Sequence, residues 1–172
     1  MSPKSTIFAG LYDHAVWLRV NGRGTFQTSA GMKEYTRRMV QRGHREFVID
    51  LAGCELMDST FMGTLAGIAL RLREIGSGHL TVLNPNTRNR SLLENLGLDH
   101  LFAFELPDGV SPAPQRVAQE TLSPPPADPS VQHATILSAH EALVEADPEN
   151  EARFKDVLDL LKQEPQPGAG DS

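Results

Sequence analysis

The residues best suited to chemistry are the consecutive polar side chains Asp58, Ser59 and Thr60, which follow an apolar run at 47–51 and precede a predicted helix. Asp, Ser and Thr favour helix starts because their side-chain oxygens accept N–H groups that lack a partner in the first turn. The same N–H groups and the helix dipole favour an anion, so a phosphate on Ser59 would be stabilised there. The residues alone favour a simple helix cap and leave a phosphate-accepting or nucleophilic serine as the alternative.

Other catalytic chemistry has little support in the sequence. Ser59 lacks a Gly-x-Ser-x-Gly elbow, and no feature marks any of the six histidines as its base. The histidines show no recurring metal-ligand spacing, and no glycine-rich phosphate loop of the Walker type is present. Cys54, the single cysteine, is predicted to be a buried or loop residue. We therefore predict a protein that is not an enzyme and uses no cofactor or metal.

The composition narrows the class of protein. The 172 residues are 40% hydrophobic and 22% charged, with a net charge of −6, which argues against non-specific binding to nucleic acid. A single cysteine suits a reducing compartment. Residues 1–9 do not resemble a signal peptide, and no apolar run approaches the roughly 18 residues of a membrane span. The sequence predicts a soluble, cytoplasmic protein without membrane insertion.

The first half of the chain predicts strands that alternate with helices. A hairpin is expected over residues 6–20, with its turn at Tyr12-Asp13-His14. A helix capped by Thr28 or Ser29 is expected to run to Arg42, followed by the buried strand 47–51.

The next helix is expected over residues 59–75, and its small residues Gly63, Ala66 and Gly67 are unfavourable for helix formation. Such residues persist where a sheet or a partner approaches the helix closely. A strand at 79–83, a helix capped by Thr87 and a short strand within 98–106 complete the pattern. The order predicts an α/β fold, with helices packed on a mixed, mostly parallel sheet.

The character of the chain changes at Pro107. We interpret residues 107–130 as a proline-rich linker, residues 131–164 as C-terminal amphipathic helices and residues 165–172 as a disordered tail. Asp147-Pro148-Glu149 is typical of a helix start. We expect the apolar faces of these helices to pack back on the domain, to form a homodimer or to bind a partner.

Val48-Ile49-Asp50-Leu51, followed by Leu56-Met57-Asp58-Ser59-Thr60 and a helix with Gly63, resembles the STAS domain family and most closely its anti-sigma factor antagonist branch. The resemblance covers residues 5–106 and implies the STAS fold. It implies a bacterial partner-switching protein that is phosphorylated on Ser59, with Thr60 as a second acceptor. The implied partners are a serine kinase of the GHKL ATPase type, which is also the anti-sigma factor, and a serine phosphatase of the PP2C type. The unphosphorylated domain would bind the kinase, and phosphorylation would release it.

The same resemblance implies a partner-binding face along the start of the helix, made of Asp58, Ser59, Thr60, Phe61, Met62, Gly63 and Thr64. Phe61 and Met62 replace the glycine that usually follows the hydroxyl pair in the family. We expect Phe61 to be an exposed aromatic side chain that alters the choice of partner or anchors it.

Three other functions remain open. The chain could be a constitutive STAS interaction subunit or scaffold, for example in a transporter assembly, with Ser59 only a cap. It could bind a small ligand, such as a nucleotide or an anion, at the same helix N-terminus. A hydrolase that uses Ser59 is the most distant alternative.

Overall fold

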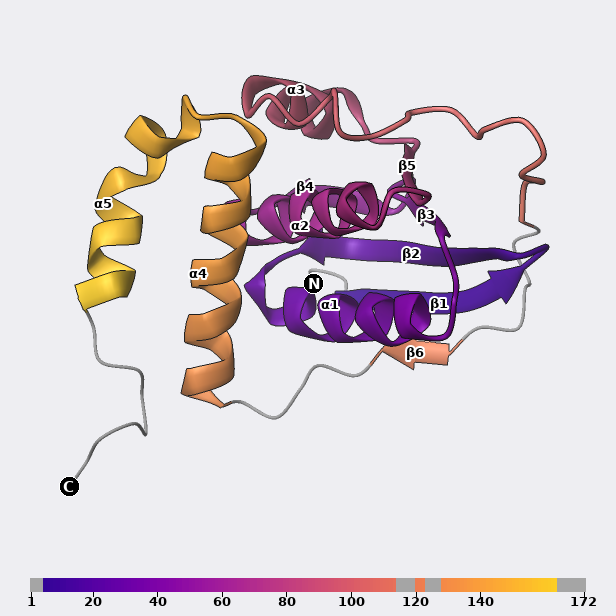
Figure 1. Ribbon diagram of the computed structural model, residues 1–172, viewed down its shortest axis with the longest axis horizontal. Helices are drawn as coiled ribbons and strands as arrows, with labels where there is room; N and C mark the ends of the chain where they lie inside the picture. Colours follow the sequence, from indigo (N-terminus) through magenta and orange to yellow (C-terminus); the bar gives the residue numbers. More distant parts are fainter. Residues whose placement is uncertain (1–4, 114–119, 123–127, 164–172) are drawn as a thin grey trace.

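The computed structural model describes residues 5–113, 120–122 and 128–163 (Figure 1). Strands and helices alternate through the first part of these residues, and two helices follow at the C-terminal end. The strands are β1 (Thr6–Tyr12), β2 (Ala15–Gly24), β3 (Glu46–Asp50), β4 (Cys54–Met57), β5 (His79–Leu83) and β6 (Glu120–Leu122). The helices are α1 (Phe26–Gln41), α2 (Ser59–Ile75), α3 (Thr87–Asn95), α4 (Pro129–Ala146) and α5 (Asn150–Gln163).

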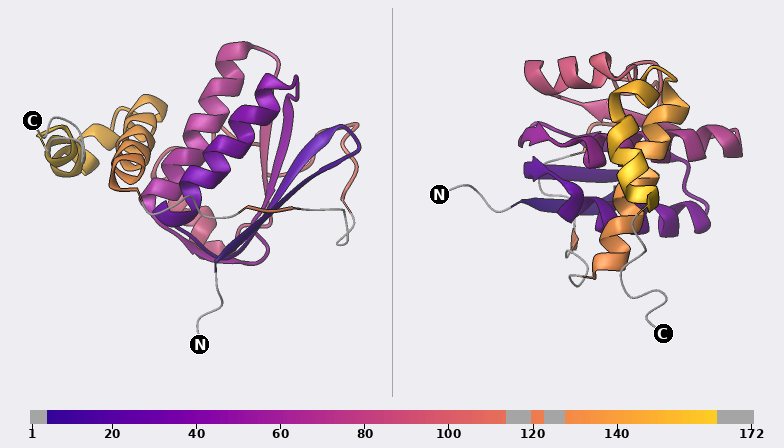
Figure 2. Two further views of the ribbon diagram at one scale, coloured as in Figure 1. Left: turned by 90° about the horizontal axis from the view of Figure 1, so that it is seen from below. Right: turned by 90° about the vertical axis from the view of Figure 1, so that its left-hand side faces the viewer.

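The sheet is mixed, with the order β5-β3-β2-β1-β6 and with β4 paired to the end of β2. Strands β5, β3 and β2 are parallel, as are β2 and β4, whereas β1 is antiparallel to both β2 and β6. Figure 2 shows α1 and α2 between the sheet and the α4–α5 pair. The α/β fold with a mixed sheet is therefore confirmed.

The main core lies where α1 and α2 pack against the sheet. Leu18, Phe47 and Ile49 from the strands and Met32 and Leu65 from the helices are completely buried in it. Burying each such side chain contributes about 1.5–3 kcal/mol relative to leaving it exposed. This core fixes α2 rigidly against the sheet, and so fixes the position of its first residues.

A smaller core covers the opposite face of the sheet. Ala15, Trp17 and Val48 are buried there, and Leu106 and Val110 pack on them. The first residues of the expected linker thus cover part of the sheet.

The predicted hairpin is confirmed. Its turn residues Asp13 and His14 both have positive φ, 47° and 63°. Two positive φ values at the centre of a two-residue connection are the requirement of a type I′ turn, whose twist matches that of the paired strands.

Two helix caps differ from the prediction. Helix α1 is capped by Thr25, not by Thr28 or Ser29. The Thr28 hydroxyl instead accepts the Thr25 N–H, which makes a reciprocal capping box. Helix α3 is capped by Asn86 rather than Thr87, because the Asn86 side chain accepts the N–H three residues later.

The strand expected within 98–106 is wrong. This segment forms turns, with one isolated parallel bridge between Thr81 and Ala103. Leu101 and Phe102 are both buried in the main core, whereas consecutive side chains of a strand point to opposite faces. A bent backbone resolves that conflict.

Two short strands lie where none was expected. Strand β4 falls in the predicted loop before Asp58, and β6 falls within the predicted linker. Each gains its order from a neighbour far away in the sequence, since β4 pairs with β2 and β6 with β1. The predicted tail at 165–172 and parts of the linker lie outside the described residues.

The C-terminal helices pack back on the domain, the first of the expected outcomes. Helix α4 lies across α2 and also contacts α1, and α5 packs on α4 (Figure 1). The Asn150 side chain donates hydrogen bonds to the carbonyls of Leu96 and Leu143, at 2.9 and 2.8 Å. This buried amide ties the connection between α4 and α5 to the end of α3. None of the described helices has the length and apolar character needed to cross a membrane.

Candidate partner-docking and modification site

Asp58 joins the N-termini of two helices. One carboxylate oxygen accepts the N–H of Phe61 in α2 at 2.8 Å, and the other accepts the N–H of Phe26 in α1 at 2.9 Å. The Asp58 N–H donates to the carbonyl of Gly24 at 2.8 Å, next to the point where α1 begins. Because a carboxylate is favoured at the positive end of a helix dipole, Asp58 stabilises both helix starts at once. Asp58, and not Ser59, is the cap of α2.

Ser59 is the first residue of α2, and its hydroxyl oxygen lies 2.9 Å from Nε2 of His140 in α4. The other ring nitrogen of His140, Nδ1, lies 2.7 Å from the carbonyl oxygen of Ile136. A carbonyl can only accept, so Nδ1 carries a proton. In the neutral ring Nε2 is then the acceptor, and the Ser59 hydroxyl donates to it. The hydroxyl predicted to accept phosphate is thus already bound within the chain.

The backbones of α2 and α4 approach closely beside this pair. A Cβ added at Gly63 would lie 2.2 Å from the carbonyl oxygen of Ala139, and one added at Gly67 would lie 3.7 Å from Cβ of Ala142. The glycine at position 63 is therefore what permits the contact. The expectation that the small residues of this helix mark a close approach is confirmed, and the element that approaches is α4.

Helix α5 supports α4 from its outer side. The His140 ring packs edge-on against Phe154, with 5.1 Å between the ring centroids. Nε2 of His133 in α4 lies 2.8 Å from the carbonyl oxygen of Leu161 in α5. We refer to α4 and α5 together, residues 129–163, as the cover.

The predicted partner-binding face is largely buried under the cover and in the core. Thr60, Met62 and Thr64 are each no more than 5% exposed. Phe61 is completely buried, so the expectation of an exposed aromatic side chain is wrong. Its ring packs over Gly24, where an added Cβ would come within 2.6 Å of it. Phe61 is a core residue that holds α2 against the end of β2.

The Ser59–His140 pair was missed because 81 residues separate its members, and the sequence carries no signal that joins them. A serine beside a histidine invites comparison with a catalytic pair. Here Nδ1 of His140 is held by a backbone carbonyl rather than a carboxylate, and neither of two grooves beside α1 is lined by Ser59 or His140. The geometry suits a hydrogen bond that holds α4 against α2 better than a catalytic site that binds a substrate.

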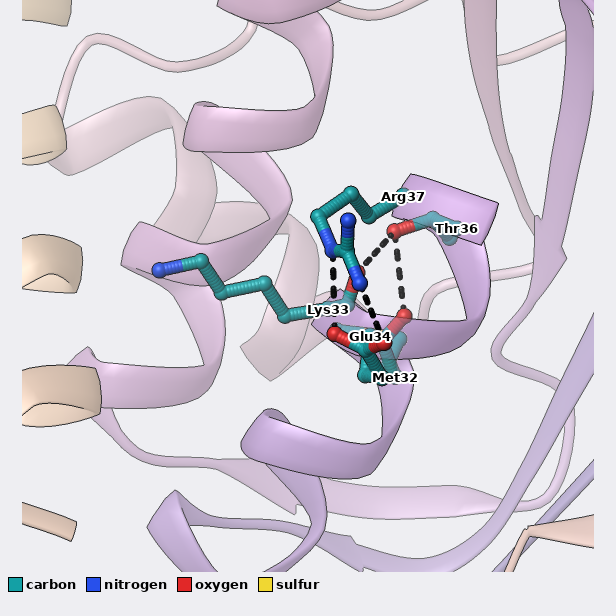
Figure 3. A network of polar contacts seen from close by, with 5 residues as sticks. All are labelled: Met32, Lys33, Glu34, Thr36 and Arg37. Atoms are coloured by element: carbon teal, nitrogen blue, oxygen red, sulfur yellow. Dashed lines mark hydrogen bonds and ion pairs between the residues drawn. The ribbon is translucent and has the colours of Figure 1, made fainter. Parts of the chain in front are cut away.

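One of these grooves, of about 370 Å³, lies between α1, α2 and α4. Lys33 reaches across it and donates to the hydroxyl of Ser138 in α4 at 3.0 Å. Figure 3 shows Lys33 extending away from the ion pair of Arg37 and Glu34, whose hydrogen bonds lower the pKa of the Glu34 carboxyl. Thr36 donates to the carbonyls of Met32 and Lys33 (Figure 3). Within the described ranges, no group of three or more His, Cys, Asp or Glu could hold a metal ion.

Comparisons with known proteins agree with this architecture. A model of the STAS domain family, described as "Mlab, STAS domain", matches residues 8–106. The solution structure of the Thermotoga maritima protein TM1081 is similar, with a TM-score of 0.52 and 20% identity, over 61% of this chain and 80% of that one. The unphosphorylated form of the Bacillus anti-sigma factor antagonist SpoIIAA has a TM-score of 0.51 and 18% identity, over 59% of this chain and 88% of that one. At such identities the likeness concerns the fold. No curated protein matches the chain. The cover lies outside the residues that the family model matches.

Proposed function

This chain belongs to the STAS domain family, and we propose that it is a phosphorylatable partner-switching protein of the anti-sigma factor antagonist kind. The observation that carries the proposal is the position of the Ser59 hydroxyl. It stands on the first residue of a 17-residue helix, beside a carboxylate on which the N-termini of two helices converge. The positive N-terminal ends of α1 and α2 favour additional negative charge beside Ser59.

The proposed switch is electrostatic. A phosphate on Ser59 adds close to two negative charges next to Asp58. The partner would dock on the side of α2 that now faces α4, along Ser59, Gly63 and Thr64, and the buried Phe61 does not belong to this face. Repulsion from an acidic partner surface, or the cost of desolvating the phosphate against an apolar one, then disfavours the complex, and removal of the phosphate restores it.

The implied partners are a serine kinase of the GHKL ATPase type and a serine phosphatase of the PP2C type, acting in the cytoplasm of a bacterium. Ser59 is the favoured acceptor because the neighbouring Thr60 is only 5% exposed. We propose residues 5–106 as the switching domain, to whose sheet the later strand β6 adds an edge. A homodimer could form through the exposed apolar side chains Val157 and Leu160 of α5, and the mass of the protein in solution tests this.

A second candidate function has its own support. If the Ser59–His140 bond never opens, the chain is a constitutive STAS interaction subunit or scaffold, for example in a transporter assembly. The 2.9 Å contact that already occupies the hydroxyl favours this alternative. It predicts a persistent complex and no transfer of phosphate.

The deciding experiment is intact-mass spectrometry after incubation with ATP and the serine kinase encoded nearest to this gene. We expect one added phosphate on the wild-type chain and none on Ser59→Ala. The Thr60→Val variant is the matched control and should still gain one phosphate. If several candidate kinases leave the wild-type mass unchanged, the phosphorylation hypothesis fails and the constitutive subunit is favoured.

A further inference from the structure

We propose that the cover is a displaceable internal competitor, which occupies the partner-docking face of α2 and holds Ser59 until it detaches as a unit from an intact STAS domain. The purpose of this device rests on the proposed function. The detachment itself is a property of the chain alone and can be measured without a kinase.

The cover and a kinase compete for the same space at Ser59. A kinase must place a nucleotide phosphate in line with the Ser59 oxygen, and the ring of His140 now stands 2.9 Å from that oxygen. The backbone carbonyl of Ala139 contacts Gly63 one turn further along α2. An external partner that docks on the first two turns of α2 would therefore overlap α4, so the two occupants exclude one another.

The cover is held on α2 by few large apolar side chains. The buried side chains of α4 are His133, Thr135, Ala139, His140 and Leu143, of which Leu143 alone is a large aliphatic residue. The α2 surface beneath it is made largely of threonine and glycine at positions 60, 63, 64 and 67. Leu143 belongs to the main core, and Ala142, Ala146 and Phe154 are only partly buried against it. Opening would expose this apolar contact, and polar contacts such as Ser59–His140, Lys33–Ser138 and Asn150–Leu96 would be exchanged for water.

The opposite side of α2 is held much more tightly. On its sheet side, Phe61, Leu65 and Leu72 are no more than 1% exposed and belong to the main core. Segments with few buried apolar contacts open at lower free energy than the core unfolds. The contact of α2 with the cover should therefore open at a lower free energy than its contact with the sheet.

A disulfide can lock the cover shut. The Cβ position at Gly67 lies 3.7 Å from Cβ of Ala142, within the range of about 3.5–4.5 Å that disulfides span. The native Cys54 does not compete, because it is 3% exposed and burial raises the pKa of its thiol. The full-length G67C/A142C variant therefore gives a closed state when oxidised and a free state when reduced. The single variants G67C and A142C are the controls for the substitutions themselves.

Native-state hydrogen exchange tests the detachment. In the reduced variant we expect the amides of α4 to be at least about tenfold less protected than those of β3 at the centre of the sheet. Oxidation should raise the protection of α4 relative to β3 by at least about the same factor. Equal protection of α4 and β3 in the reduced protein would overturn the proposal, because the cover would then open only when the whole domain unfolds.

The competition is tested with the kinase that phosphorylates the wild-type chain. Oxidised G67C/A142C should be phosphorylated at least about tenfold more slowly than the same protein after reduction. Equal rates in the two states would refute the competition and leave phosphorylation of Ser59 intact. If no kinase modifies even the reduced protein, the proposed function fails, and hydrogen exchange still decides whether the cover detaches.

Discussion

The substitution Gly63→Ala tests the contact between α2 and α4 most directly. The added methyl carbon would lie 2.2 Å from the carbonyl oxygen and 2.6 Å from the carbonyl carbon of Ala139. Both are backbone atoms, so no side-chain rotation relieves the clash, and α4 must move outward by about 1 Å to reach ordinary contact. Overpacking of this kind costs about 1–3 kcal/mol. Replacing a helical glycine by alanine recovers about 1 kcal/mol of helix propensity.

Gly67→Ala is the matched control, since it lies on the same helix and faces the same partner one turn later. Its added Cβ would sit 3.7 Å from Cβ of Ala142, which is an ordinary contact. This variant should therefore gain up to about 1 kcal/mol from helix propensity alone. The expected difference between the two variants is the overpacking term, about 1–3 kcal/mol, with Gly63→Ala the less stable.

Urea unfolding of both full-length variants, followed by circular dichroism, measures that difference. Hydrogen exchange of α4 should show in addition that Gly63→Ala loosens the cover more than it loosens the sheet. Equal shifts in the unfolding free energy of the two variants, in the same direction, would refute the claim that Gly63 is needed for the approach of α4. The Ala139 carbonyl of α4 would then have to lie farther from Gly63 than the 2.2 Å from its Cβ position indicates.

Three further predictions concern stability and are measured by urea unfolding. Gly24→Ala should destabilise the chain by about 1–3 kcal/mol, because its Cβ would press on the buried ring of Phe61, and an unchanged midpoint would contradict that contact. Asp58→Ala should cost roughly 1–3 kcal/mol and Asp58→Asn less, because the amide retains one of the two acceptors that cap α1 and α2; equal losses would argue against the double cap. Burial raises the pKa of the Glu46 carboxyl above its ordinary 4.5, and the charge of His79 partly opposes this shift. The folded state therefore favours the protonated acid, and the stability that this gives is lost as the pH rises through the raised pKa. Glu46→Gln should therefore stabilise the chain at pH 8, the gain should shrink below about pH 4.5, and a gain independent of pH would refute the assignment.

The elements near the site were predictable where local sequence decides the structure. The apolar run at 47–51 and the cap at Asp58 predict a strand followed by a helix, and the structure has both. The failures occur where partners distant in the sequence decide. Strand β4 exists because it pairs with β2, and its four residues carry no alternation strong enough to predict it. Thr25 was missed as a cap because Thr28 and Ser29 have equally suitable side chains.

Phe61 shows why one feature of the site was predicted wrongly. In a helix that packs against a sheet on one side, the position two residues after Ser59 can face either the sheet or the solvent, and the choice depends on the packing of its neighbours. Gly24 provides the space that the ring fills, and nothing in the sequence connects these two positions. The same holds for Ser59 and His140, which come from parts of the chain that the sequence presents as separate units.

The geometry of α2 also limits what can replace the cover. Only a helix that docks as closely as α4 does needs a glycine at position 63, because the atom 2.2 Å from the Cβ position there is the Ala139 carbonyl oxygen of α4 itself. A partner that phosphorylates Ser59 must also leave its hydroxyl oxygen open, which α4 does not do. A partner that binds without phosphorylating Ser59 can cover this oxygen, whereas a kinase cannot. A residue with a bulky side chain at position 63 would therefore exclude the cover and any helical partner that docks as closely, while Ser59→Ala would leave both free to dock and would abolish the modification alone.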